Sequence, residues 1–278
     1  MSSPSRVSPT LCLIGAGNMG GAMLAGWLAS NHTAQNITVV DPKPSEQMVN
    51  LMSEAGVRHV EQPHDAKRPE LIVVAVKPQL MAAVLPGLSG LVDGENALLS
   101  VAAGTTIAQL SAPFSNVHPR IIRAMPNTPA MVRRGITVCV SNERVSDEQR
   151  NMVSDVLSAV GSVEWVEDER LMDAVTGVSG SGPAYVFHLA ETLAAAGVAA
   201  GLPDGLAARL AEATVSGAGE LMRQSDLPPA ELRKNVTSPN GTTQAALEVL
   251  MAGDGFPGLL REAVQAATQR SIELAKKP

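Results

Sequence analysis

The sequence is poor in aromatic residues. Its 278 residues include three Phe, two Trp and one Tyr, so the core must be built from aliphatic side chains. Proteins that bind single-stranded nucleic acid stack bases on aromatic side chains, and this chain has little material for such a platform. It also lacks a basic excess. A net charge of −6 and a pI near 5.4 argue against a broad surface for nucleic acid or an anionic membrane. We therefore expect neither among its partners.

Cysteines and long hydrophobic runs are scarce as well. Cys12 and Cys139 each lie inside a short apolar run, and no C-x-x-C pair is present. This argues against a structural disulfide or a zinc site, so we expect no metal and a reducing, cytoplasmic location. No apolar run approaches the roughly 20 residues that span a bilayer. The run Leu11–Ile14 is too short for the hydrophobic core of a signal peptide.

The first part of the chain alternates between two patterns. Short aliphatic runs predict strands at Thr10–Ile14, Ile37–Val40, Leu71–Val76, Leu98–Val101, Ile121–Ala124 and Gly135–Val140. Segments rich in Ala, Met and Leu predict helices between them, at Gly20–Ser30 and Ser45–Ala55, the second ending at Gly56. Strands that are apolar on both faces and alternate with helices are typical of a parallel sheet covered on both sides.

The pattern changes near residue 168. No strand pattern follows, and helices are predicted at 184–201, 203–224, 241–252 and 257–277, with Pro183, Pro203 and Pro257 in first turns. These Ala- and Gly-rich helices make a thin core alone, so we expect them to bury apolar surface against another subunit; the alternative is a monomer packed on its own sheet. The predicted fold is an α/β Rossmann-type dinucleotide-binding domain (1–168) followed by an all-α dimerisation domain (169–278).

A glycine-rich loop supports the dinucleotide interpretation. Gly15-Ala16-Gly17-Asn18-Met19-Gly20 reads G-x-G-x-x-G, and it follows a predicted strand and opens a predicted helix, as the dinucleotide fingerprint requires. Gly15 would permit the tight turn, Gly17 the approach of backbone to the pyrophosphate, and Gly20 close packing of helix on strand. The helix N-terminus supplies N–H groups for the phosphates, so an acidic protein still has a local anion site.

Asp41 bears on the choice of dinucleotide. It follows the second predicted strand, about 20 residues after Gly20, where an acidic side chain accepts the ribose hydroxyls of NAD and repels a 2′-phosphate. Lys43 would offset that repulsion, and Asp41-Pro42 could be a simple turn. The predicted cofactor is therefore NADPH or NADH, with the preference open.

Four further segments resemble one family in their order and spacing. They are Ala75-Val76-Lys77-Pro78, Met125-Pro126-Asn127-Thr128-Pro129, Val178-Ser179-Gly180-Ser181-Gly182-Pro183-Ala184-Tyr185 and Val236-Thr237-Ser238-Pro239-Asn240-Gly241-Thr242-Thr243. With them, nearly the whole chain resembles pyrroline-5-carboxylate reductase. The last segment is the most specific, and it departs from the family at Asn240, where a glycine is usual. Because Asn tolerates left-handed backbone, we expect the loop to keep its shape.

The resemblance implies a reaction and a set of site residues. The family reduces the cyclic imine of 1-pyrroline-5-carboxylate to L-proline with NADPH or NADH, the last step of proline biosynthesis. Its helical domains interlock in dimers that often assemble further. The implied cofactor contacts are Ala16, Asn18, Met19, Asp41, Lys43, Val76, Lys77, Ala103 and Asn235; Pro78 and Asn127 join them because they follow predicted strands at the ligand-binding edge. The implied substrate contacts are Glu169, Ser238, Gly241, Thr242 and Thr243.

The chemistry suits these residues. Successive N–H groups between Ser238 and Thr243, before a helix, would hold the substrate carboxylate. The Thr243 hydroxyl would bind the ring nitrogen and fix the face that receives hydride. Plainer interpretations remain: Ser238 as a helix N-cap, Thr242 and Thr243 as partners of first-turn N–H groups, and Glu169 as part of a solvated charge run.

Two other functions compete with this one. A 3-hydroxyacid or 6-phosphogluconate-type dehydrogenase needs a lysine base in the helix between its domains, and residues 184–201 contain no lysine. A non-catalytic dinucleotide-binding regulator would have an altered pocket, whereas the segment from Ser238 to Thr243 is intact. The number of subunits, the proton donor and feedback by proline stay open.

Overall fold

The computed structural model describes residues 8–30 and 32–275. Within this range the chain forms two compact units. The first contains the described residues up to Gly180 and those from Thr268 onward, and the second runs from Ser181 to Ala267. The last helix of the chain thus begins in the second unit and ends in the first.

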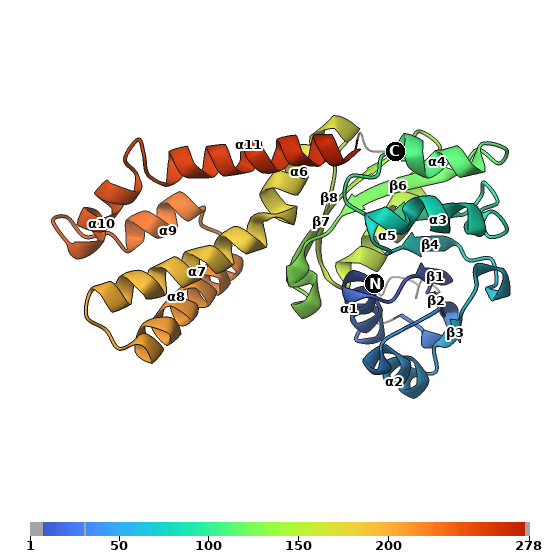
Figure 1. The fold of residues 1–278 in the computed structure, drawn as a ribbon, viewed down its shortest axis with the longest axis horizontal. Helices are drawn as coiled ribbons and strands as arrows, with labels where there is room; N and C mark the ends of the chain where they lie inside the picture. Colours follow the sequence, from blue (N-terminus) through green and yellow to red (C-terminus); the bar gives the residue numbers. More distant parts are fainter. Residues whose placement is uncertain (1–7, 31, 276–278) are drawn as a thin grey trace, which may run out of the picture. The chain divides into compact units, whose positions relative to one another are not determined.

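An eight-stranded sheet forms the centre of the first unit (Figure 1). Its strands are β1 (Leu11–Ile14), β2 (Ile37–Val40), β3 (Arg58–Val60), β4 (Leu71–Val74), β5 (Ala97–Ser100), β6 (Arg120–Met125), β7 (Gly135–Ser141) and β8 (Gly161–Trp165). Their order is β3-β2-β1-β4-β5-β6-β7-β8. The predicted parallel arrangement holds from β3 to β6. Strand β7, however, pairs antiparallel with β6, and β8 pairs parallel with β7. The short β6–β7 connection stays at one edge of the sheet, which only an antiparallel pair allows.

Helices cover both faces of this sheet. They are α1 (Asn18–Leu28), α2 (Glu46–Ala55), α3 (Met81–Val84), α4 (Ile107–Ser111), α5 (Asp147–Ser158) and α6 (Met172–Val175). Single 3-10 turns lie at Ala34–Asn36, Pro63–Asp65, Pro78–Leu80, Leu85–Leu88, Ala112–Phe114, Thr128–Val132 and Glu169–Leu171, and a π-helical turn lies at Thr176–Gly180.

Two aliphatic layers make the core. On one face Met23 and Trp27 of α1 and Val156 of α5 pack against the sheet, and the Trp27 indole N–H donates to the Val156 carbonyl. On the other face Met81 and Leu110 pack from α3 and α4. The apolar β runs of the sequence therefore lie between two helical layers, as predicted.

The second unit is helical. It contains α7 (Gly182–Ala199), α8 (Asp204–Gln224), α9 (Pro229–Asn235), α10 (Thr242–Leu250) and the first part of α11 (Phe256–Ala275). A Cβ on Gly197 of α7 would lie 3.3 Å from the Cβ of Ala207 on α8, so small residues bring these two helices together. Pro203 is the N-cap of α8 and lies just before the first turn in which it was expected.

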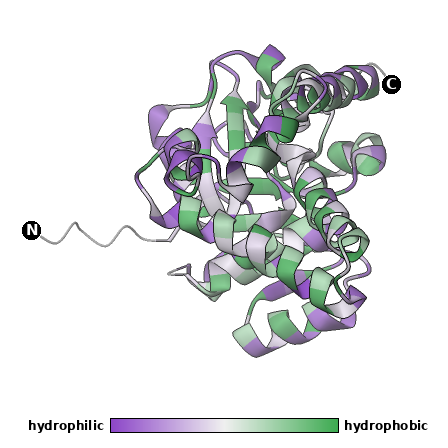
Figure 2. Cartoon of the chain, turned by 90° about the vertical axis from the view of Figure 1, so that its left-hand side faces the viewer, coloured by the Kyte–Doolittle hydropathy of each residue, from purple (hydrophilic) through white to green (hydrophobic). Residues whose placement is uncertain are grey.

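The second unit has little core of its own. Among its described hydrophobic residues only Ala207 and Ala211 are buried. Figure 2 shows hydrophobic residues recurring along the helices. Many large ones are exposed: Val186, Phe187, Leu189, Leu193, Val198, Leu202, Leu206, Leu210, Leu221, Met222, Leu227, Val236, Val249, Leu250, Met251, Phe256, Leu259 and Leu260. A single copy thus leaves uncovered the apolar surface that we expected another subunit to cover. None of the described helices is both long and apolar enough to cross a membrane.

Candidate functional site

The cofactor candidates of the first unit meet at one edge of the sheet. Parallel strands β1, β2, β4, β5 and β6 end there, and the predicted residues follow directly: Gly15–Gly20, Asp41 and Lys43, Val76–Pro78, Ala103 and Asn127. Backbone hydrogen bonds join the loops, since Gly15 N–H donates to the Val40 carbonyl and Ala75 N–H to the Ile14 carbonyl. Open α/β sheets bind ligands in the crevice at this edge.

The three fingerprint glycines have three different environments. Gly15 has a φ of +90°, which a residue with a side chain rarely adopts. A Cβ on Gly20 would overlap the carbonyl oxygen of Gly15 and lie 3.2 Å from the Cβ of Ala75. A Cβ on Gly17 would meet nothing within 4 Å. Gly15 and Gly20 are thus required by the fold itself, whereas Gly17 leaves space above the loop.

That space suits a dinucleotide pyrophosphate. Gly17 is the N-cap of α1, and no side chain caps the helix there. The N–H groups of a first helical turn have no partner within their own helix and carry the positive end of the helix dipole. The exposed backbone at Gly17 and Asn18 therefore fits a bound phosphate group.

Asp41 is held by two backbone donors. Its Oδ2 accepts a hydrogen bond from the Ala16 N–H at 2.8 Å, and its Oδ1 accepts one from the Lys43 N–H at 2.8 Å. His59 Nε2 donates to the Asp41 carbonyl at 2.8 Å. The carboxylate thus joins the end of β2 to the fingerprint loop, so it organises the turn in addition to any contact with a ribose.

The remaining cofactor candidates at this edge of the sheet differ in their exposure and in their hydrogen bonds. Lys77 and Pro78 are exposed beyond β4, and Ala103 is half-buried beyond β5. Asn127 Oδ1 accepts a hydrogen bond from the Ile136 N–H at 3.0 Å. That bond closes the β6–β7 connection, which gives Asn127 a structural role.

The charge run at 167–170 divides into two parts. Arg150 binds Glu167, and Arg170 binds Asp168 at 2.7 Å, both at the surface. The hydrogen bond from the Arg170 side chain lowers the pKa of Asp168. Glu169 instead faces inward. Its Oε1 accepts a hydrogen bond from the Ile107 N–H at 2.8 Å and pairs with Arg123 Nη1 at 3.0 Å. The plainer interpretation of Glu169 as part of a solvated charge run is therefore wrong.

The sequence patterns did not identify Arg123 as a candidate site residue. It lies in the middle of β6 and is only 4% exposed. The available signal was a single arginine inside the apolar run Ile121-Ile122-Arg123-Ala124. A charged side chain at a core position of a strand needs a partner, and such a partner marks a site worth locating.

The substrate candidates other than Glu169 belong to the second unit. Ser238 and Gly241 lie in the turn before α10, and Thr242 and Thr243 are its first two residues; the cofactor candidate Asn235 ends α9 in the same unit. Asn240 has a φ of +58°, the left-handed backbone that was predicted for it. Gly241 is the N-cap of α10 and no side chain caps the helix, so the interpretation of Ser238 as its N-cap is wrong.

The turn before α10 is compact. The Gly241 N–H donates to the Ser238 carbonyl at 3.1 Å. A Cβ on Gly241 would lie 3.0 Å from the same oxygen, so a side chain there would crowd the turn. Thr242 is exposed and Thr243 half-buried. The uncapped first turn of α10, with two adjacent threonine hydroxyls, is a set of donors suited to a carboxylate.

Within the described residues, the cysteines and the metal-ligating residue types form no further candidate site. Cys12 and Cys139 are free and buried, and burial raises the pKa of each thiol to about 12. Within residues 8–30 and 32–275, no group of three or more His, Cys, Asp or Glu side chains could hold a metal ion.

Comparison with known proteins identifies the family. Residues 169–274 match the family described as pyrroline-5-carboxylate reductase dimerisation, and residues 10–104 match the one described as NADP oxidoreductase, coenzyme F420-dependent. A pyrroline-5-carboxylate reductase of Pseudomonas aeruginosa is 41% identical over 271 residues, which cover 97% of this chain and 98% of that protein. This chain belongs to the pyrroline-5-carboxylate reductase family. A second member, from Synechocystis sp., is 42% identical and covers 98% of this chain and 100% of its own length.

Solved structures of the family agree. A pyrroline-5-carboxylate reductase of Coxiella burnetii has a TM-score of 0.90 at 32% identity, covering 97% of this chain and 100% of its own. A Plasmodium falciparum pyrroline carboxylate reductase, solved with NADP bound, has a TM-score of 0.79 at 28% identity, covering 99% and 100%. The predicted resemblance and fold class are confirmed: an α/β sheet domain is followed by a helical dimerisation domain, which implies self-association.

Proposed function

We propose that this protein reduces 1-pyrroline-5-carboxylate to L-proline by hydride transfer from NADPH or NADH, the last step of proline biosynthesis. The observation that carries the proposal is the full-length similarity to pyrroline-5-carboxylate reductases, at 41% and 42% identity over nearly the whole chain. The match spans both the fingerprint loop and the turn before α10, which supports a two-part site for cofactor and substrate.

The cofactor supplies the hydride, and the chain must bind and orient it. The pyrophosphate would rest on the backbone of Gly15–Gly20 at the start of α1, where Gly17 leaves room for it. Asp41 and Lys43 would face the adenosine ribose. The remaining proposed contacts are Val76, Lys77, Pro78, Ala103, Asn127 and Asn235.

The substrate offers a carboxylate and a ring nitrogen. The carboxylate would accept hydrogen bonds from the first N–H groups of α10, at Thr242 and Thr243, where the positive end of the helix dipole lies. The Thr243 hydroxyl would bind the ring nitrogen and thereby fix which face of the C=N bond receives hydride. The hydride adds to carbon and a proton adds to nitrogen, from solvent or through Thr243 and water, so the product is the neutral ring amine or its protonated form.

Assembly and location complete the proposal. The exposed leucines of the helical unit support a homodimer or a higher homo-oligomer. The other proposed partner is the small-molecule substrate, with no nucleic acid and no membrane. Two free, buried thiols are typical of a reducing compartment and support a cytoplasmic location. We propose the boundary between the functional domains at residues 168 and 169.

Thr243→Ala tests the catalytic assignment. Losing the contact that positions the imine should lower kcat on the order of tenfold to hundredfold. The affinity for NADPH, measured by calorimetry without substrate, should stay unchanged. Thr192→Ala is the matched control, because that hydroxyl in α7 donates to the His188 carbonyl and carries no proposed role. An undiminished kcat in Thr243→Ala would remove this residue from the mechanism.

A further inference from the structure

A buried arginine lies directly beneath one of the proposed cofactor loops. Arg123 of β6 is paired in register with Ser100, the last residue of β5, and only 4% of it is exposed. The loop Val101–Thr106 begins at that strand end. A guanidinium in this position loses its hydration and requires an anionic partner.

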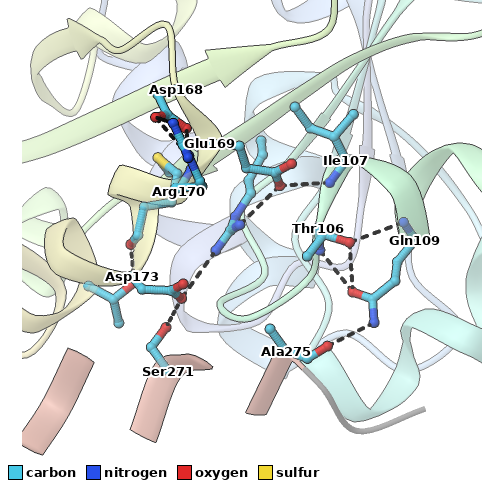
Figure 3. Close-up of polar contacts among 12 residues, drawn as sticks. Thr106, Ile107, Gln109, Asp168, Glu169, Arg170, Asp173, Ser271 and Ala275 are labelled. Carbon is cyan, nitrogen blue, oxygen red and sulfur yellow. Dashed lines mark hydrogen bonds and ion pairs between the residues drawn. The ribbon is translucent and has the colours of Figure 1, made fainter. Parts of the chain in front are cut away.

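Glu169 is that partner, and it also contacts the backbone beyond the loop. Its Oε1 lies 3.0 Å from Arg123 Nη1 and accepts the Ile107 N–H at 2.8 Å (Figure 3). Ile107 is the first residue of α4 and directly follows the loop. One carboxylate oxygen therefore links the sheet interior to the end of the loop. The other end is fixed by β5, where the Ala102 N–H donates to Ser100 Oγ.

Further contacts within the same unit hold this region. Asp173 Oδ1 lies 4.0 Å from Arg123 Nη2 and accepts a hydrogen bond from Ser271 Oγ at 2.7 Å. Gln109 Nε2 donates to the Ala275 carbonyl at 3.2 Å. A Cβ on Gly104 would lie 3.5 Å from the Cβ of Leu274. The end of α11 therefore packs against the loop that the ion pair anchors.

A purely stabilising role accounts poorly for this arrangement. The cost of desolvating two charges offsets much of their attraction, and a buried ion pair often adds no more stability than apolar side chains of the same volume. What an apolar pair would not supply is the acceptor for the Ile107 N–H. The specific contribution of this ion pair is thus to hold the backbone of residues 101–107 in one conformation.

We propose that Arg123 is a positioning residue that acts through Glu169 to hold the loop Val101–Thr106 in the conformation that receives the nicotinamide dinucleotide. The inference rests on the proposed function for the identity of that ligand. It also gives Glu169 a role toward the cofactor in place of the substrate contact that the resemblance implied.

Arg123→Met tests the proposal, because it removes the charge and keeps an unbranched chain of similar volume. The Kd of NADPH, measured by calorimetry without substrate, should rise by up to about tenfold, the factor that corresponds to the loss of one hydrogen bond. The KM for pyrroline-5-carboxylate should stay unchanged. Glu169→Ala should weaken NADPH binding similarly, and the double variant should bind NADPH no more weakly than either single variant, since both act on one contact.

Arg120→Met is the matched control. Arg120 is in the same strand and pairs with Glu95 at 2.7 Å, but at the opposite end of β6 from the loop. Its loss should leave the Kd of NADPH unchanged. If Arg123→Met does not fold, Glu169→Gln is measured instead; it keeps an acceptor for the Ile107 N–H but no charge for Arg123, and its Kd should still rise.

The outcomes separate cleanly. An unchanged Kd in the Arg123 or Glu169 variants overturns the inference, as does an equal rise in Arg120→Met. A raised substrate KM with unchanged Kd in Glu169→Ala overturns it in favour of a substrate contact. A wild-type protein that binds NADPH but forms no proline rejects the proposed function alone, because the Kd comparison needs no turnover.

Discussion

Alanine substitutions at two fingerprint glycines should separate folding from cofactor binding. Gly17 has a φ of −72° and a ψ of −158°, which alanine adopts without strain, and its added Cβ would meet nothing within 4 Å. Gly20 is also in ordinary backbone, but its added Cβ would overlap the Gly15 carbonyl oxygen. Backbone cannot yield as a flexible side chain does, so the turn or the start of α1 must move.

The expected magnitudes differ accordingly. For Gly17→Ala, the lower entropy of the unfolded chain and the weaker N-cap nearly cancel, so the free energy of unfolding should change by less than about 1 kcal/mol. If the pyrophosphate lies against this backbone, the methyl group displaces it from at least one charge-assisted hydrogen bond. At about 1.5–3 kcal/mol for such a bond, the Kd of NADPH should rise roughly 10- to 150-fold.

For Gly20→Ala, overpacking should cost about 1–3 kcal/mol of unfolding free energy. At about 2–4 °C per kcal/mol for a protein of this size, the Tm should fall by about 2–12 °C. The NADPH affinity should fall as well, because the Gly15 turn belongs to the cofactor loop.

The assay is a thermal melt at fixed protein concentration together with NADPH calorimetry, for the wild type and both variants. We expect Gly17→Ala to keep the wild-type Tm and bind NADPH weakly, and Gly20→Ala to have a lowered Tm. Unweakened binding in Gly17→Ala would refute the placement of the pyrophosphate on this loop. A wild-type Tm in Gly20→Ala would refute the close packing of α1 on Gly15.

Two further predictions concern Asp41 and the thiols. Asp41→Ser removes a charge that would repel a 2′-phosphate, so the ratio of kcat/KM for NADPH to that for NADH should rise, and an unchanged ratio would contradict the assignment. Because burial raises the pKa of Cys12 and Cys139 to about 12, neither is ionised near pH 8. Native protein should therefore resist a thiol reagent that labels both residues after denaturation, and rapid native labelling of either would show that it is accessible.

The interior of the sheet was the part that the sequence predicted best. β2 lies at Ile37–Val40 as predicted, and α2 ends at Ala55, just before its C-cap Gly56, whose φ is +71°. The secondary structure of such segments is determined by burial and by local backbone sterics, and both leave a recognisable pattern in the sequence. The edge strands β3 and β8 were not predicted, because they are short and partly exposed and so lack a continuous apolar run.

Two of the helices that were not predicted, α5 and α9, were missed for different reasons. Helix α5 is mostly polar on its exposed side, although Ser146 and Gln149 form a capping box that marks its start. Helix α9 is short, and prolines occupy its N-cap and its first position. The direction of β7 depends on where the chain turns after β6, which no local pattern specifies.

Only those parts of the candidate site that consist of contiguous sequence motifs were predicted. The fingerprint glycines and the left-handed Asn240 follow from the backbone that each position requires. Arg123 and Glu169 lie 46 residues apart, and their pairing exists only once β6 and the segment after β8 are folded together. No spacing rule connects them, so the structure was needed to find the pair.

The central claim is that this chain converts 1-pyrroline-5-carboxylate to proline. The direct measurement incubates purified protein with that imine and NADPH or NADH, follows oxidation of the cofactor by its loss of near-ultraviolet absorbance, and quantifies proline in the same samples. We predict proline formed in equal amount to cofactor oxidised. No oxidation with either cofactor, or oxidation without proline, would contradict the account.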